Sequence, residues 1–97
     1  MIRMSVLYPA TDGATFDHDY YKDKHVPLAC RAWGLEGADI DKGTDDAQPY
    51  VAAVHFTFPS VDAMAQAMAS EKTGAVMADV ANYTTIQPVI QVSEIVS

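Results

Sequence analysis

The stretch YVAAVHFTF at residues 50–58 decides the fold of this chain. Its β-branched and aromatic residues favour an extended strand, and Pro59 ends it because proline has no amide hydrogen for a neighbouring strand. Alternate side chains of a strand point to opposite faces. One face carries Tyr50, Ala52, Val54, Phe56 and Phe58, and the other carries Val51, Ala53, His55 and Thr57. Because both faces are mostly apolar, we expect a central strand that is covered on both sides.

Three weaker strands are predicted outside this stretch. Residues 2–8 are rich in strand formers and stop at Pro9. Residues 35–41 carry few apolar side chains among acidic ones, which is typical of an edge strand that avoids pairing with other chains. Residues 85–96 read as a long strand, and their Pro88 is tolerated only at a sheet edge or a bulge.

Two helical segments follow the central strand. Residues 61–70 form the first, with Ser60 as its cap, because a serine hydroxyl can accept an unpaired amide of the first turn. Its buried stripe is predicted to be Val61, Met64, Ala65 and Met68. Residues 71–83 form a further helical stretch, which we expect Gly74 to interrupt.

The order is therefore strand, helix, strand, strand, helix, strand, which is the ferredoxin-like βαββαβ pattern of an α+β protein. Right-handed crossovers place the first and third strands in the centre of a four-stranded antiparallel sheet, with the helices on one face. The other face would be bare although it is largely apolar. A second copy of the sheet would cover it, so we expect a homodimer that forms an α+β barrel.

The chemically richest stretch is FDHDYYKDKHVPLACRAWG, residues 16–34. Asp17 is suited to cap a helix that Gly34 ends in a left-handed conformation. Tyr21 and His25 fall on one helical face, with Leu28 and Ala32 further along it. Pro27 predicts a kink or two short helices in series, because it cannot donate to the carbonyl of Asp23.

His25 is the first candidate for chemistry. An imidazole can act as a general acid or base near neutral pH, or donate a hydrogen bond to a bound carbonyl or phenol. The alternative is a structural histidine that ties the break at Pro27 to the loop before the helix. A backbone carbonyl freed by that break is its expected partner.

Length and composition limit the function. The 97 residues make one domain, and the formal net charge of -7 with only six Lys and Arg side chains argues against nucleic acid. No apolar run is long enough for a membrane span, and no signal peptide is evident at the start, so we expect a cytoplasmic protein. Cys30 is the only cysteine, which excludes an intrachain disulfide and a thiolate metal site.

A family resemblance rests on residues 8–34. The order runs from Tyr8-Pro9 through a short polar loop to Phe16-Asp17, Asp19-Tyr20-Tyr21, Lys24-His25, Pro27-Leu28 and Trp33-Gly34. This order resembles the signature of the EthD family, and a more general second piece is Phe58-Pro59-Ser60 followed by an alanine-rich helix. The resemblance implies a ferredoxin-like subunit that dimerises into an α+β barrel. The family is named for a protein associated with oxidative breakdown of an alkyl ether, and related small barrels include cofactor-independent enzymes that act on aromatic polyketides.

The candidate site residues fall into two sets. His25 and Tyr21 are the candidate catalytic residues, and Tyr20, His55, Ser5 and Thr57 are candidates for lining a ligand pocket. His55 would either line an apolar cavity between two sheets or be a core histidine bonded to Thr57 or Ser5 across strands. The three histidines have no metal-ligand spacing, and no phosphate loop, nucleophile elbow or dinucleotide fingerprint occurs, so we expect neither a metal nor a cofactor.

Three functions compete on these residues. The first is a small barrel that acts on or binds a hydrophobic organic metabolite, which by the resemblance belongs to oxidative catabolism and oxidoreductase chemistry. The second is a non-catalytic binding or accessory module that serves a monooxygenase system. The third is a purely structural dimer whose histidines are core residues. Turnover of ether or aromatic compounds would separate the first from the others.

Overall fold

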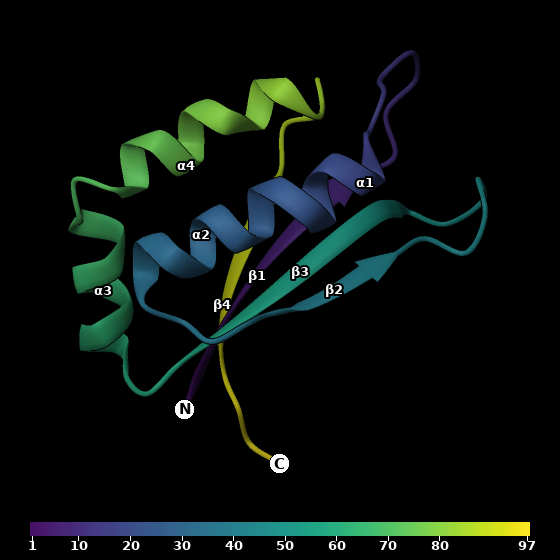
Figure 1. Cartoon of the computed structure of the whole chain (residues 1–97). Coiled ribbons are helices and arrows are strands. Elements are labelled where there is room, and N and C mark those ends of the chain that lie inside the picture. The colour runs from purple at the N-terminus through teal and green to yellow at the C-terminus, as the bar shows by residue number, and fades with distance from the viewer.

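One antiparallel sheet with helices on a single face makes up the molecule, in a computed structural model that describes residues 1–97 (Figure 1). The strands are β1 (Ile2–Pro9), β2 (Asp39–Lys42), β3 (Tyr50–Phe58) and β4 (Val89–Glu94). The helices are α1 (His18–Tyr20), α2 (Val26–Trp33), α3 (Val61–Ala69) and α4 (Thr73–Asp79). A π-helical segment, Tyr21–His25, joins α1 to α2 and is called the π-turn below, and a 3₁₀ turn, Val80–Asn82, follows α4.

The strand order is β2-β3-β1-β4, which confirms the ferredoxin-like prediction with the first and third strands in the centre. All pairs are antiparallel. In the central pair, Met4 lies opposite Phe56 and Val6 lies opposite Val54. The two shorter strands, β2 and β4, therefore lie at the edges of the sheet. The acidic side chains of β2 discourage pairing with a strand of another chain.

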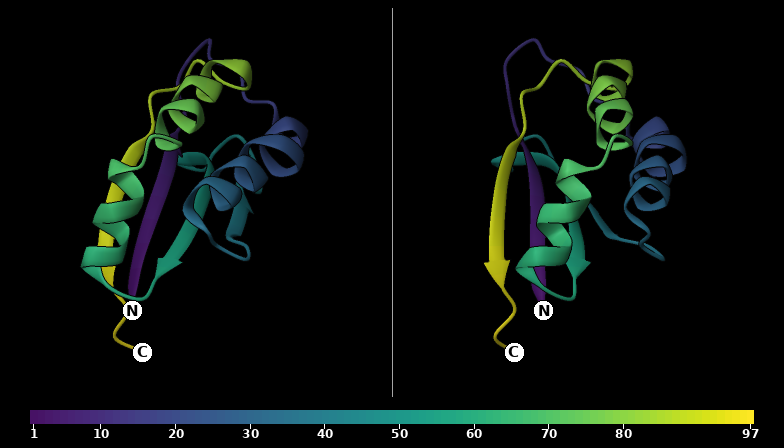
Figure 2. Two further views of the ribbon diagram at one scale, coloured as in Figure 1. Left: turned by 60° about the vertical axis from the view of Figure 1, so that its left-hand side comes forward. Right: turned by 90° about the vertical axis from the view of Figure 1, so that its left-hand side faces the viewer.

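The core lies between the sheet and the helices. Its buried strand residues are Met4, Tyr8, Ala52, Val54, Phe56 and Phe58, all on one face as the alternation predicts. Seen edge-on in Figure 2, every helix lies on this side and the opposite face of the sheet has no cover. The chain thus has two layers, one of helices and one of sheet.

Some boundaries differ from the prediction. β4 begins at Val89, after Pro88, because the proline cannot donate to the ladder. Gly74 does not interrupt α4, which runs through it. On α3 the buried stripe is rotated: Val61 is 56% exposed and Ala65 is exposed, whereas Met64 and Met68 pack on the core.

The helices are tied together by side chains. Trp33, at the end of α2, donates from Nε1 to the Thr73 hydroxyl at 2.9 Å, and Thr73 donates to the Ala67 carbonyl at 2.6 Å. Gly34 ends α2 with a φ of 69°, as predicted. None of the helices has the length and hydropathy that crossing a membrane requires.

Candidate functional site

The site begins at the start of α1. Asp17 caps this helix, and its Oδ1 accepts the Tyr20 amide at 3.0 Å. One turn later the backbone widens into the π-turn, where the Val26 amide bonds to the Tyr21 carbonyl. Pro27 follows directly, so the predicted break at Pro27 is present as a wider turn instead of a sharp kink.

The π-turn brings two rings of the chain together. The rings of Tyr21 and His25 are stacked, with centroids 5.5 Å apart and planes at 16°. Both residues are buried, Tyr21 being 1% exposed and His25 6% exposed. The predicted shared face of these two residues is confirmed, and it looks into the core.

His25 is held by a carboxylate from another helix. Its Nδ1 lies 2.9 Å from Oδ2 of Asp79, at the end of α4. The predicted partner, a backbone carbonyl at the Pro27 break, is therefore wrong. The π-turn places the imidazole within reach of α4, and the carboxylate is the stronger acceptor.

Asp79 accepts three hydrogen bonds. Tyr20 donates to its Oδ1 at 2.7 Å and Asn82 donates to the same oxygen at 2.9 Å, in addition to the bond from His25. Burial alone would raise the pKa of this carboxyl, but the bonds from Asn82, Tyr20 and His25 outweigh it and lower the pKa. Asp79 is therefore a fixed anion at neutral pH.

The imidazole of His25 is neutral at the same pH. Burial lowers its pKa, and the bond to Asp79 only partly opposes that effect. Since a carboxylate can only accept, Nδ1 carries the hydrogen and Nε2 has a free lone pair. No side chain or backbone group of the chain bonds to Nε2. The arrangement orients a base by a carboxylate, as acid–base catalysis requires.

Three tyrosines pack around this pair. The hydroxyls of Tyr8 and Tyr83 bond to each other, and the ring of Tyr83 lies 4.5 Å from that of His25 by centroids. Tyr21 lies next to Tyr8, with centroids 5.4 Å apart, but its hydroxyl is fully buried and has no partner. Burial raises the pKa of all three phenols, so they stay protonated.

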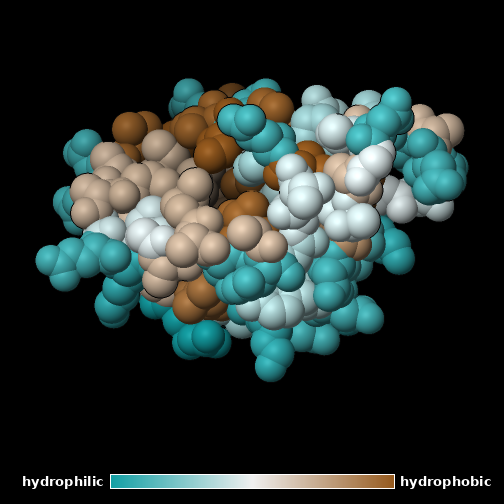
Figure 3. All heavy atoms as spheres, turned by 90° about the horizontal axis from the view of Figure 1, so that it is seen from above, coloured by the Kyte–Doolittle hydropathy of each residue, from teal (hydrophilic) through white to brown (hydrophobic).

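A small, partly open cavity of about 60 Å³ lies beside these groups. It is lined by Met4, Val6, Tyr8, Tyr21, His25, Ala29, Trp33, Val54, Phe56, Met68, Val76, Met77, Val80, Pro88 and Ile90. Two of them, Met77 and Ile90, are more than half exposed, which puts the opening between α4 and β4. Seen from above, apolar atoms gather on one part of the surface beside polar side chains (Figure 3).

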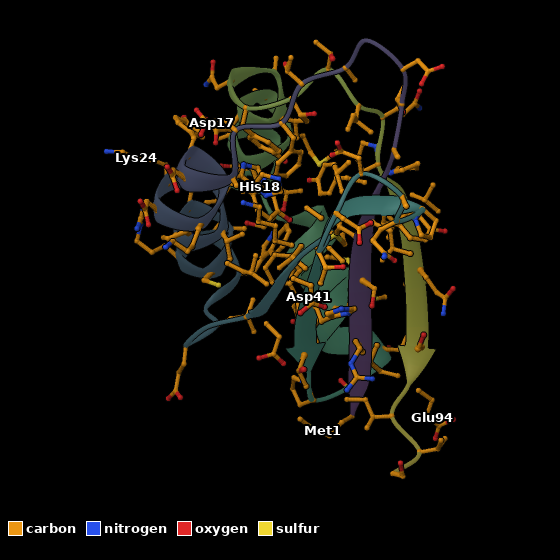
Figure 4. All side chains as sticks on the ribbon, turned by 90° about the vertical axis from the view of Figure 1, so that its right-hand side faces the viewer. Met1, Asp17, His18, Lys24, Asp41 and Glu94 are labelled. Atoms are coloured by element: carbon orange, nitrogen blue, oxygen red, sulfur yellow. The ribbon has the colours of Figure 1, made fainter.

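Larger hollows occur elsewhere and are more open to solvent. The largest, of about 560 Å³, lies between the loop after β1 and the loop before β3 and is lined mainly by polar loop residues. His18 lies at its edge, at the start of α1 (Figure 4). No three metal-ligating side chains gather there or elsewhere in the chain. The small cavity has the apolar wall and the few convergent polar groups of a ligand site, although its 60 Å³ is well below the roughly 300 to 1,000 Å³ of most such sites.

The other predicted pocket residues lie on the bare face of the sheet. Ser5 Oγ is 2.7 Å from Nδ1 of His55, and Nε2 of His55 is 3.1 Å from Oδ2 of Asp41 on β2 (Figure 4). The cross-strand bond from His55 to Ser5 is the one expected of a structural histidine. Thr57 is exposed on the same face and forms no side-chain hydrogen bond. This group is separated by the sheet from the cavity beside His25.

The sequence reasoning missed Asp79, Asn82 and Tyr83. Asp79 lies 54 positions after His25, and no local pattern connects them. A weak signal was present, since Asp79 and Asn82 are the polar positions at the end of an otherwise apolar helical stretch and lie three residues apart. Their spacing indicated one shared helical face, but not its partner.

Several solved structures resemble the whole chain. An EthD-like protein from Ralstonia eutropha JMP134 is 36% identical, with a TM-score of 0.86, over 99% of this chain and 92% of that one. An EthD family protein from Bacillus halodurans C-125 is 16% identical, with a TM-score of 0.77, over 99% of each chain. A dimeric ferredoxin-like protein from Bacteroides fragilis NCTC 9343 is 11% identical, with a TM-score of 0.59, over 97% of this chain and 95% of that one. At these low identities, the similarity to the Bacillus and Bacteroides proteins shows only a shared fold.

The sequence also matches a family profile. No curated protein shows a significant match. The profile of the EthD domain matches residues 9–87, a range that contains the π-turn, His25 and Asp79. Together with the close structural relative from Ralstonia, this match places the chain: it belongs to the EthD domain family.

Proposed function

We propose that the chain binds a small hydrophobic organic molecule in the cavity between helices and sheet, and that His25 moves a proton of that molecule at Nε2. The observation that carries the proposal is the His25–Asp79 pair, 2.9 Å apart, at the wall of an otherwise apolar cavity. A buried carboxylate–imidazole pair fixes the tautomer and the direction of the free lone pair.

The same pair supports acid–base chemistry without a bound cofactor. The cavity walls contain tyrosines, one histidine and apolar side chains, and the proton-transfer group with a pKa nearest neutrality among them is His25. Tyr21 stacks on its ring and helps to fix it, which is a positioning role for the second predicted catalytic residue. Tyr20 holds Asp79 from the outer side and therefore does not line the pocket.

The resemblance to the EthD family makes oxidative catabolism of such a molecule the proposed setting. The relative from Bacillus halodurans carries the ethyl tert-butyl ether name of the family, and this supports ethers and related oxygen compounds as first candidates. In this setting the chain supplies an apolar, water-poor pocket and one base.

Activity assays on matched variants test the proposal. His25→Gln retains a side-chain amide that can donate to Asp79 but removes the basic nitrogen, so turnover of a phenol probe, which has a proton for His25 to accept, should fall by about a hundredfold or more. His18→Gln is the control, because His18 lies outside the cavity. Turnover by His25→Gln at the wild-type rate would exclude His25 as the base.

A second candidate function is a ligand-binding accessory module of a monooxygenase system. One observation favours it: the two tyrosines that line the cavity, Tyr8 and Tyr21, have raised pKa values, so the site contains a base but no second group that readily exchanges protons near neutral pH. Saturable binding of a probe to the cavity, without turnover by the isolated chain, would support this function.

We further propose a homodimer through the bare sheet face. Val51, Ala53 and Thr57 lie on that face with His55, and the exposed Val89 extends it. These apolar side chains, with Leu7, lie among polar ones from all four strands, and an exposed apolar patch with a polar surround is typical of an interaction surface. The relative from Bacteroides fragilis is a dimeric protein of the same fold, which supports this arrangement.

A further inference from the structure

The hydroxyl of Tyr21 is the one fully buried side-chain polar atom of the chain that has no hydrogen-bond partner. An unpartnered buried hydroxyl is unfavourable, and native proteins usually satisfy such groups. The hydroxyls of the two neighbouring phenols, Tyr8 and Tyr83, bond to each other, and neither lies in hydrogen-bond geometry with Tyr21. Tyr21 lines the cavity, so a group bound there can complete its hydrogen bonding.

The charges around the cavity limit what that group is. No lysine or arginine lines the cavity, and the nearest anion is Asp79, which already has three donors. An anionic ligand would face this carboxylate without a compensating cation. A cation is also disfavoured, because no Asp or Glu lines the cavity and Asp79 beside it already accepts three hydrogen bonds.

We propose that the ligand is an uncharged molecule with a carbonyl or ether oxygen, and that this oxygen accepts the hydrogen bond of Tyr21. The inference rests on the proposed function and adds the chemical class of the ligand and the residue that recognises it. Ionised acids and ammonium compounds are excluded from the cavity by the same reasoning.

The size of the cavity restricts the first probes. A volume of about 60 Å³ matches roughly two water molecules or a compound of about four heavy atoms. A larger ligand requires Met68 and Met77 to move, and methionine side chains adapt readily because they are unbranched. Acetone, 2-methylpropene, acetate and isopropylammonium have closely similar shapes and differ in charge and in the acceptor oxygen.

Titration of the full-length chain with these four probes, followed by NMR of Val76, Ala29 and the tyrosine rings, tests the inference. Acetone should bind wild type, and Tyr21→Phe should weaken it by about threefold to tenfold, the effect of losing one hydrogen bond. Binding of 2-methylpropene should be unchanged or tighter in Tyr21→Phe, because it has no oxygen to lose. Acetate and isopropylammonium should bind at least about tenfold more weakly than acetone.

The outcomes separate this inference from the proposed function. If Tyr21→Phe changes acetone and 2-methylpropene alike, or if either charged probe binds as well as acetone, the inference is overturned while the cavity remains a binding site. If none of the four probes shifts the cavity resonances, the cavity itself is overturned as a binding site. Loss of acetone binding in Tyr21→Phe alone, with the apolar probe retained, supports the assignment.

Discussion

At the scale of single residues, the decisive feature is the contrast between Asp79 and Tyr21. The Asp79 carboxylate accepts hydrogen bonds from three side chains, whereas the buried Tyr21 hydroxyl has no hydrogen-bond partner. Both groups lie near His25. The first makes the imidazole rigid, and the second leaves hydrogen-bonding capacity for a molecule that the chain itself does not supply.

This contrast predicts opposite effects of the same substitution at two tyrosines. Tyr21→Phe removes an unpartnered hydroxyl, so the free energy of unfolding should stay the same or increase by about 1 kcal/mol. Tyr8→Phe breaks the bond to Tyr83 and leaves that buried hydroxyl alone, so it should lower the free energy of unfolding by about 1 to 3 kcal/mol. Urea unfolding of both variants measures the difference. Equal destabilisation would mean that Tyr21 has a protein partner.

A pH dependence of stability follows from His25. Its folded pKa lies below the unfolded value of 6.5, so the unfolded chain binds more protons between the two values. Stability should therefore be full above about pH 6.5 and fall as the pH decreases towards the folded pKa. In His25→Gln the urea midpoint should change less between pH 7.5 and pH 5.5, a window set by roughly one unit on each side of the unfolded pKa.

His18→Gln is the comparison for that experiment, because the pKa of His18 is also lowered by burial. Each variant should remove only the part of the pH dependence of the urea midpoint that its own histidine contributes. A wild-type slope that persists in His25→Gln would assign the effect to other groups. The folded pKa of Asp79 is also lowered, so its carboxylate also stabilises the folded chain at neutral pH. This contribution to the free energy of unfolding is lost only as the pH falls below the ordinary pKa of 3.8.

At the scale of helices and strands, the π-turn decides where the chemistry lies. A regular α-helix through Tyr21 and His25 would also place them on one face. The extra residue in the π-turn, however, rotates the side chains of α1 about the helix axis relative to those of α2. Asp17 can then cap α1 while the apolar face of α2 packs on the core. The π-turn before Pro27 thus directs one face of α1 and one face of α2 towards the core, which a single regular helix would not do.

Two glycines give an element-scale prediction. Gly34 ends α2 with a φ of 69°, a conformation that other residues adopt only with strain, so Gly34→Ala should lower the free energy of unfolding by about 1 kcal/mol. Gly74 lies within α4 with open space around it, and Gly74→Ala should raise the free energy of unfolding by about 0.5 to 1 kcal/mol. Thermal and urea unfolding check both. Destabilisation by Gly74→Ala would contradict a continuous α4.

The sequence predicted elements better than it predicted the site. Local signals decided the caps at Asp17 and Ser60 and the end of α2, because each depends on residues only a few positions apart. The strand order followed from chain connectivity. The pairing of His25 with Asp79 depends on how α4 lies across α2, which no local pattern specifies. The rotated face of α3 was missed for the same reason, since alanine is apolar enough to suit either side.

At the scale of the whole molecule, the sheet separates two polar systems. His25 and its cavity lie on the helix side, while Ser5, His55 and Asp41 lie on the bare face. The cavity is complete within one chain. Binding in the cavity should therefore not depend on dimerisation, although both properties follow from the same fold.

The last prediction concerns the dimer. Sedimentation of the wild-type chain at micromolar concentration should give twice the chain mass of 10.5 kDa. Thr57→Glu should shift the chain to monomer, because Thr57 is exposed in the single chain but would be buried between two sheets, where desolvating a carboxylate is unfavourable even beside Arg3, its cross-strand neighbour.

Val61→Glu is the matched control, since Val61 is an exposed residue of α3 on the opposite side of the molecule. It should remain dimeric, as the helix face takes no part in the contact. The Thr57→Glu monomer should still bind acetone in the cavity beside His25, because every lining residue comes from the same chain. A dimer that survives Thr57→Glu but dissociates in Val61→Glu would place the interface on the helices and reverse the proposed assembly.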